Sequence, residues 1–97
     1  MANVTTKKHK NIEFVHSVKV ITDAGPYTQE WDHTIHHDRE TGEFEILKIE
    51  AVNLKEGREF SRTDITKGWI DSGLFDMYQS KFDFAEAWHN YVNEPFN

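Results

Sequence analysis

The densest group of side chains that could do chemistry lies between His33 and Asp38, in the segment His-Thr-Ile-His-His-Asp. Neutral imidazole nitrogens together with a carboxylate suit Zn, Ni or Cu. On an extended strand, however, His33 and His37 would share a face but lie about 13 Å apart, while His36 would point to the opposite face. His36 and Asp38 form the only closely spaced pair on one face, which predicts at most a weak surface site. We therefore interpret the three histidines as solvated groups at the end of a strand and expect no resident metal or other cofactor.

Groups needed for other kinds of catalysis are missing from the sequence. The chain has no cysteine, and its five glycines form neither a phosphate-binding loop nor a dinucleotide fingerprint. The serines at 17, 61, 72 and 80 lie in no recognisable nucleophile context. We predict that the protein is not an enzyme. A metal-dependent enzyme that uses His33, His36, His37 and Asp38 is kept as the second alternative.

Five carboxylates lie between Asp71 and Glu94, with a single lysine, Lys81, near them. Acidic residues near helix N-termini are also favoured by capping and by the helix dipole, so part of this set has a structural explanation. The functional interpretation is that these carboxylates, with a neighbouring aromatic residue, bind a basic surface on a protein partner and imitate the phosphates of a nucleic acid. The residues predicted to bind the partner are Asp71, Asp76, Tyr78, Asp83, Glu86 and Glu94.

The formal net charge of −6 is unevenly distributed along the chain. Residues 1–22 carry +3, whereas residues 23–97 contain seven basic and sixteen acidic side chains and carry −9. Such an excess of carboxylates repels a phosphate backbone, so we do not expect the acidic body to bind nucleic acid directly. The sequence has no apolar run long enough to span a membrane and no apolar N-terminal stretch typical of a secretory signal. We expect a cytoplasmic protein, in agreement with the absence of cysteine.

The first two thirds of the chain read as strands joined by turns. Met1–Lys10 is polar and basic, which predicts a flexible N-terminal arm. Alternation of apolar and polar residues predicts strands over 12–21, 27–36 and 43–54, and a short fourth strand over 58–61. In the third of these, the apolar residues change phase between Ile46 and Leu47, which predicts a β-bulge at this point.

The pattern changes to a helical period after Ser61. Ser61 and Asp64 resemble a capping box, and Gly73 is a plausible helix end. A further short helical turn is predicted around Leu74, Met77 and Tyr78. The strongest helical signal follows Asp83, a predicted N-cap, with an apolar stripe that Pro95 would end. The stripe consists of Phe84, Ala87, Trp88, Tyr91 and Val92.

Strands followed by helices, without alternation, predict a single α+β domain over residues 11–97. We expect an antiparallel β-meander of three to four strands, followed by two or three C-terminal helices packed on one face. A meander leaves sheet edges open, so a self-associating structural or assembly protein, for example a homodimer, is the first alternative function.

The leading functional hypothesis is a small acidic protein, not an enzyme, that modulates or inhibits a larger protein with a basic surface. A nucleic-acid enzyme or a host defence complex is the kind of partner that this chemistry suggests. In size, acidity and aromatic content, the chain is broadly similar to small phage-encoded inhibitors of such enzymes and complexes. This likeness is one of composition and not of motif.

Overall fold

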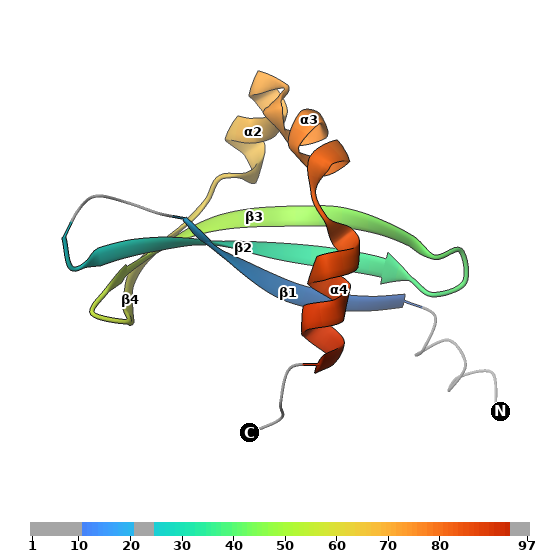
Figure 1. Ribbon diagram of the computed structural model, residues 1–97. Coiled ribbons are helices and arrows are strands. Elements are labelled where there is room, and N and C mark those ends of the chain that lie inside the picture. The colour runs from blue at the N-terminus through green and yellow to red at the C-terminus, as the bar shows by residue number, and fades with distance from the viewer. Residues whose placement is uncertain (1–10, 21–24, 94–97) are drawn as a thin grey trace, which may run out of the picture.

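The computed structural model describes residues 11–20 and 25–93. Four strands form one antiparallel sheet in the order β1-β2-β3-β4, and three helices follow (Figure 1). The elements are β1 (Asn11–Val20), β2 (Tyr27–Asp38), β3 (Glu43–Lys55), β4 (Arg58–Asp64), α2 (Thr66–Ser72), α3 (Leu74–Lys81) and α4 (Phe84–Asn93). The predicted α+β meander is therefore confirmed. The basic arm, Glu94 and Pro95 lie outside the described residues.

The helices pack on one face of the sheet, which we call the helix face. The core cluster on this face joins Phe14 of β1, Ile35 of β2, Ile46 and Ile49 of β3, and Ala87 of α4. Half-buried side chains from all three helices surround it. Every strand residue of the cluster comes from the alternate apolar set that the sequence places on one side, because successive side chains of a strand point to opposite faces.

The phase change in β3 is a β-bulge, as predicted. Ile35 pairs with Ile46, but Thr34 pairs with Lys48, so Leu47 is the extra residue of the longer strand. Ile46 and Ile49 are both buried, while Leu47 is exposed. The bulge therefore keeps both isoleucines on the helix face at the cost of one exposed leucine.

The hairpin turns follow the local chemistry of their residues. The Asp38 carboxylate accepts the backbone N–H of Glu40 at 2.9 Å, and this hydrogen bond lowers the pKa of Asp38 below its ordinary value. Gly42, with φ of 79°, closes the β2–β3 hairpin with a hydrogen bond from its N–H to the Asp38 carbonyl at 2.7 Å. Such positive φ values favour glycine.

One local prediction is wrong, because β4 is longer than expected. Ser61 does not cap a helix but lies within β4, where it pairs with Asn53 and its hydroxyl accepts the Asn53 side-chain amide at 2.8 Å. The chain turns into α2 later, where the Asp64 carboxylate accepts the N–H of Thr66 at 2.9 Å. The end of β4 depends on its pairing with β3, which is distant in the sequence. A local capping pattern therefore cannot predict it.

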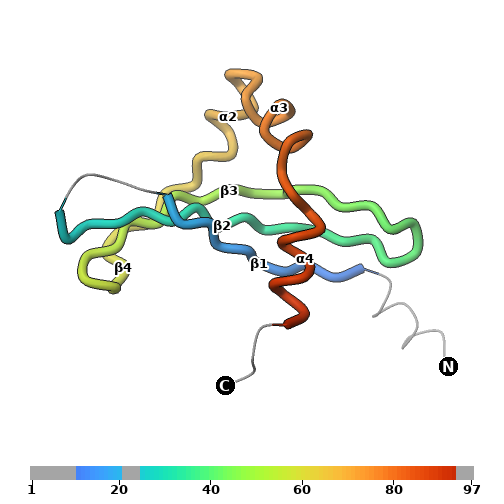
Figure 2. Tube along the Cα trace, viewed as in Figure 1, coloured from blue at the N-terminus to red at the C-terminus, as the bar shows by residue number. Residues whose placement is uncertain are grey.

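The predicted helix boundaries at Gly73 and Asp83 are confirmed. Gly73 ends α2 in the left-handed conformation, and its N–H donates to the Ile70 carbonyl at 3.1 Å. The Asp83 carboxylate caps α4 by accepting the N–H of Glu86 at 2.9 Å. Figure 2 shows the chain path from α2 and α3, which stand above β3, down to α4, which crosses β1. In the part of the chain that the structure describes, no helix has the length and apolar character needed to cross a membrane.

Candidate protein-binding surface

The histidines lie in separate environments, and the interpretation of all three as solvated is wrong for His33. Its side chain is 0% exposed on the helix face. Nδ1 lies 3.3 Å from the His16 carbonyl and Nε2 lies 2.9 Å from the Tyr78 hydroxyl. With Nδ1 protonated, the neutral ring donates to the carbonyl and accepts from the hydroxyl. Burial lowers the pKa of His33.

His36 and His37 do not join His33. The His37 ring stacks on Phe44 with centroids 4.0 Å apart, and burial lowers its pKa. His36 lies on the opposite face of the sheet, with Nδ1 4.0 Å from a carboxylate oxygen of Glu13. Within residues 11–20 and 25–93, no three histidine, aspartate or glutamate side chains converge as a metal site.

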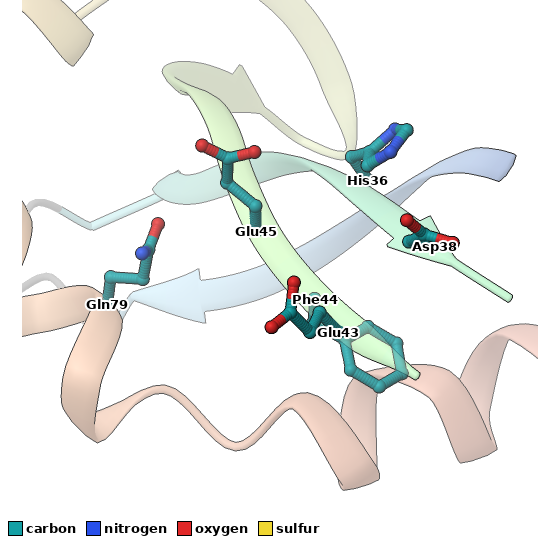
Figure 3. A pocket seen from close by; sticks show the side chains of 6 residues that line it. All are labelled: His36, Asp38, Glu43, Phe44, Glu45 and Gln79. Carbon is teal, nitrogen blue, oxygen red and sulfur yellow. The ribbon is translucent and has the colours of Figure 1, made fainter. Parts of the chain in front are cut away.

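A hollow at the β2–β3 hairpin collects several polar groups without bringing them together (Figure 3). The labelled side chains stand apart around the end of β3, and those of His36 and Asp38 lie on a different strand from the two glutamates. The Gln79 side-chain oxygen is already engaged, because it accepts the N–H of Ile46 at 3.1 Å. This arrangement offers no nucleophile next to a base. The residues that line the hollow are His36, Asp38, Glu43, Phe44, Glu45 and Gln79.

The predicted acidic residues fall into two groups along the helices. Asp71 lies on α2 and pairs with Lys67 at 2.8 Å, an i, i+4 contact that the sequence spacing could have revealed. Asp76 lies exposed in the first turn of α3. Asp83 and Glu86 lie together at the start of α4, where the Asp83 carboxylate is engaged as a cap. The sixth predicted residue, Glu94, lies outside the described residues.

Tyr78 is more deeply placed than the sequence suggests. Its hydroxyl bonds His33, its ring lies against Trp31 and Trp69, and burial raises its pKa. Tyr78 nevertheless borders two shallow grooves on the helical side, one with Trp69, Leu74 and Met77 and one with Asp83 and Glu86. Tyr78 therefore packs beneath the helical surface, and only part of its side chain is exposed.

An exposed apolar group on α2 and α3 is absent from the predicted site. Ile70, Leu74 and Met77 are 56%, 43% and 50% exposed, and we call them the tip patch. The two short helices bury none of their residues completely, and they stand away from the sheet (Figure 1). The sequence shows Leu74, Met77 and Tyr78 at helical spacing, but spacing alone cannot say which side of so short a helix faces inward.

Two carboxylates are neighbours of the tip patch in the sequence. Asp71 follows Ile70 directly, and Asp76 lies between Leu74 and Met77 in the sequence. In the described part of the chain, Asp76, Asp83 and Glu86 form no ion pair with a lysine or arginine. The helical side therefore combines apolar surface with negative charge.

Three acidic residues at the opposite, open face of the sheet share one arginine. Arg62 of β4 bonds Asp32 at 3.0 Å, Glu50 at 3.1 Å and Glu59 at 2.9 Å. These bonds raise the pKa of Arg62 and lower that of Glu59. Among the described residues, carboxylates that form no ion pair with lysine or arginine lie on the helices and also at the β2–β3 hairpin, where Glu43 and Glu45 border the hollow. Comparison with known protein families, characterised proteins and solved structures finds no match to this chain.

Proposed function

We propose that this chain is a small acidic protein, not an enzyme, that binds a larger protein and modulates or inhibits it. The tip patch, bordered by Asp71 and Asp76, is the contact surface. The observation that carries this proposal is the exposure of Ile70, Leu74 and Met77 on two helices that also carry Asp76, a carboxylate with no ion pair to a lysine or arginine among the described residues.

The two kinds of side chain have different roles in such a contact. Burial of apolar area contributes about 25 cal/mol per Å², so the tip patch supplies affinity. Carboxylates at the rim accelerate encounter with a basic surface and reject acidic ones. Asp83 and Glu86 extend the negative region toward α4. A basic groove of a nucleic-acid enzyme or a host defence complex has the matching charge.

The proposal is tested by measuring binding of the immobilised protein to a panel of purified basic nucleic-acid enzymes. For an enzyme that binds, the double change Leu74→Ser and Met77→Ser should weaken affinity at least about tenfold, because these residues would lose their buried contacts. Asp76→Asn should slow association, and raising the salt concentration should reduce the same rate.

Leu47→Ser is the matched control, because Leu47 is a leucine of similar exposure to Leu74 but lies at the β3 bulge and not on α2 or α3. It should bind as the unchanged protein does. Equal loss of binding in the Leu47 and tip-patch variants, or binding indifferent to both, would refute the assignment of this surface. Failure of the whole panel to bind would refute the proposed class of partner.

A further inference from the structure

Strand β1 is an edge of the sheet over its whole length (Figure 1). It pairs with β2 from Asn11 to Val20, and the described residues place no strand on its other side. An edge strand of ten residues presents alternate backbone N–H and C=O groups that can pair with another strand. Edges of this length are usually shortened, covered or charged in proteins that stay monomeric.

We propose that a second copy of this chain pairs with β1, antiparallel, about a two-fold axis at His16. The two four-stranded sheets then form one continuous sheet of eight strands. The contact is symmetric, because each copy offers the same strand to the other.

The charges along β1 select this register. With His16 opposite His16, Glu13 of each copy faces Lys19 of the other across the open face. In the described residues, Lys19 has no ion pair within its own chain. A shift that centres the pairing on Val15 puts Lys19 opposite Asn11, and one that centres it on Ser17 puts Lys19 opposite Val15. Both shifts lose the two opposite-charge pairs, which stabilise neighbouring strands.

The helix face is matched in the same register. Phe14 of each copy faces Val18 of the other, and Ile12 faces Val20, so apolar residues meet apolar residues. All four belong to the partly or fully buried set of β1. A shift by an odd number of residues would place these side chains opposite the polar face.

Helix α4 provides a second contact for the added copy. It packs across β1, with the rings of Trp88 and Tyr91 on Phe14 at 5.5 and 4.6 Å. Tyr91 and Val92 nevertheless remain exposed. Because Phe14 faces Val18 of the second copy, the outer side of α4 lies next to the helix face of that copy's β1. Pairing therefore covers apolar residues of α4 that the single chain leaves in water.

Charge reversal tests the register without disturbing the fold, since Glu13 and Lys19 are both exposed. We expect sedimentation velocity to show a concentration-dependent dimer. Glu13→Lys alone and Lys19→Glu alone should each raise the dissociation constant about tenfold or more, because each creates two like-charge pairs. The double variant Glu13→Lys/Lys19→Glu should regain the affinity of the unchanged protein.

A thiol at the axis gives an independent readout, because the chain contains no cysteine. His16→Cys should form a disulfide-linked dimer on mild oxidation, since directly opposed residues of paired strands lie within disulfide range. Lys19→Cys, which faces Glu13, should not. A protein that stays monomeric at all concentrations up to about 0.5 mM, where even a weak Kd would show, overturns the proposal. So does a dimer that ignores both charge reversals, or equal crosslinking at positions 16 and 19.

Discussion

The side chain with the most unusual surroundings is that of His33. A fully buried imidazole must find hydrogen-bond partners within the protein, and His33 finds one in the sheet and one in α3. The bond to Tyr78 thus fixes a helix to the sheet through polar atoms inside an otherwise apolar layer. The aromatic rings of Tyr78 and Phe82 cover the imidazole on the helical side.

The buried imidazole predicts that stability falls in mild acid. The pKa of His33 is lowered from its ordinary value of 6.5, so the unfolded chain binds the proton first as the pH falls. Its contribution is therefore complete above pH 6.5 and is lost as the pH drops through 6.5 toward the lower pKa of the folded state, by at most about 1.4 kcal/mol per pH unit. Urea unfolding at pH 7.5, 6.5 and 5.5, values chosen around that ordinary pKa, measures the effect.

A His33→Gln variant should lose less stability over this interval, since the amide keeps a polar partner for Tyr78 and does not titrate. The matched control is His89→Gln, at an exposed position of α4. It should retain the original pH dependence. An equal pH dependence in the His33→Gln variant would show that another group is responsible.

For single residues, the sequence predicted burial and side-chain partners less well than it predicted the strands and helices. The position of His33 on the apolar alternation of β2 carried the information that it is buried, but the nearby histidines and Asp38 suggested a solvated strand end instead. For Tyr78, the partner on β2 is 45 residues away, and no local pattern contains such a contact.

Single glycines control the geometry of the helical elements. Gly73 has φ of 79° and is both the C-cap of α2 and the N-cap of α3. The turn it makes sets the relative direction of the two helices that carry the tip patch. Gly68, within α2, has no such requirement, and a Cβ at either glycine would have no atom within 4 Å.

These two glycines predict opposite effects of the same substitution. Gly73→Ala should lower the free energy of unfolding by about 1 to 2 kcal/mol, because alanine resists the left-handed conformation. Gly68→Ala should leave it unchanged or raise it by up to about 1 kcal/mol, because alanine favours a helix. Urea unfolding of both variants checks the pair. A loss of stability in both, or in neither, would contradict the conformational explanation.

The elements themselves were largely predictable from the sequence. The meander, the bulge next to Leu47 and the caps at Gly73 and Asp83 follow from period, phase and turn chemistry, which are local properties. The end of β4 was missed because it depends on pairing with β3. Which sides of α2 and α3 stay exposed was also missed, since short helices take their orientation from the core they contact.

At the scale of the molecule, one apolar cluster of the described residues joins the sheet to all three helices. The three tryptophans pack against this cluster from different elements: Trp31 from β2, Trp69 from α2 and Trp88 from α4. The rings of Trp31 and Trp69 pack edge to face with centroids 5.1 Å apart, while the ring of Trp88 packs against Phe14. On the open face, Arg62 binds three of the carboxylates, Asp32, Glu50 and Glu59.

A single cluster predicts a single unfolding transition. Variants that keep one tryptophan each, with phenylalanine at the other two positions, should show fluorescence midpoints in urea that coincide with the loss of secondary structure measured by circular dichroism in the same variant. An earlier fluorescence transition in the variant that retains Trp88 would instead show that α4 opens separately from the rest.

The order of the strands has a consequence for synthesis on the ribosome. Each strand pairs with the one made just before it, so the sheet can assemble hairpin by hairpin as the chain emerges. Helix α4, which covers Phe14, is made after all four strands. Until α4 leaves the exit tunnel, the apolar helix face of the nascent sheet is exposed to chaperones and to neighbouring chains. The ten residues of α4 end this exposure.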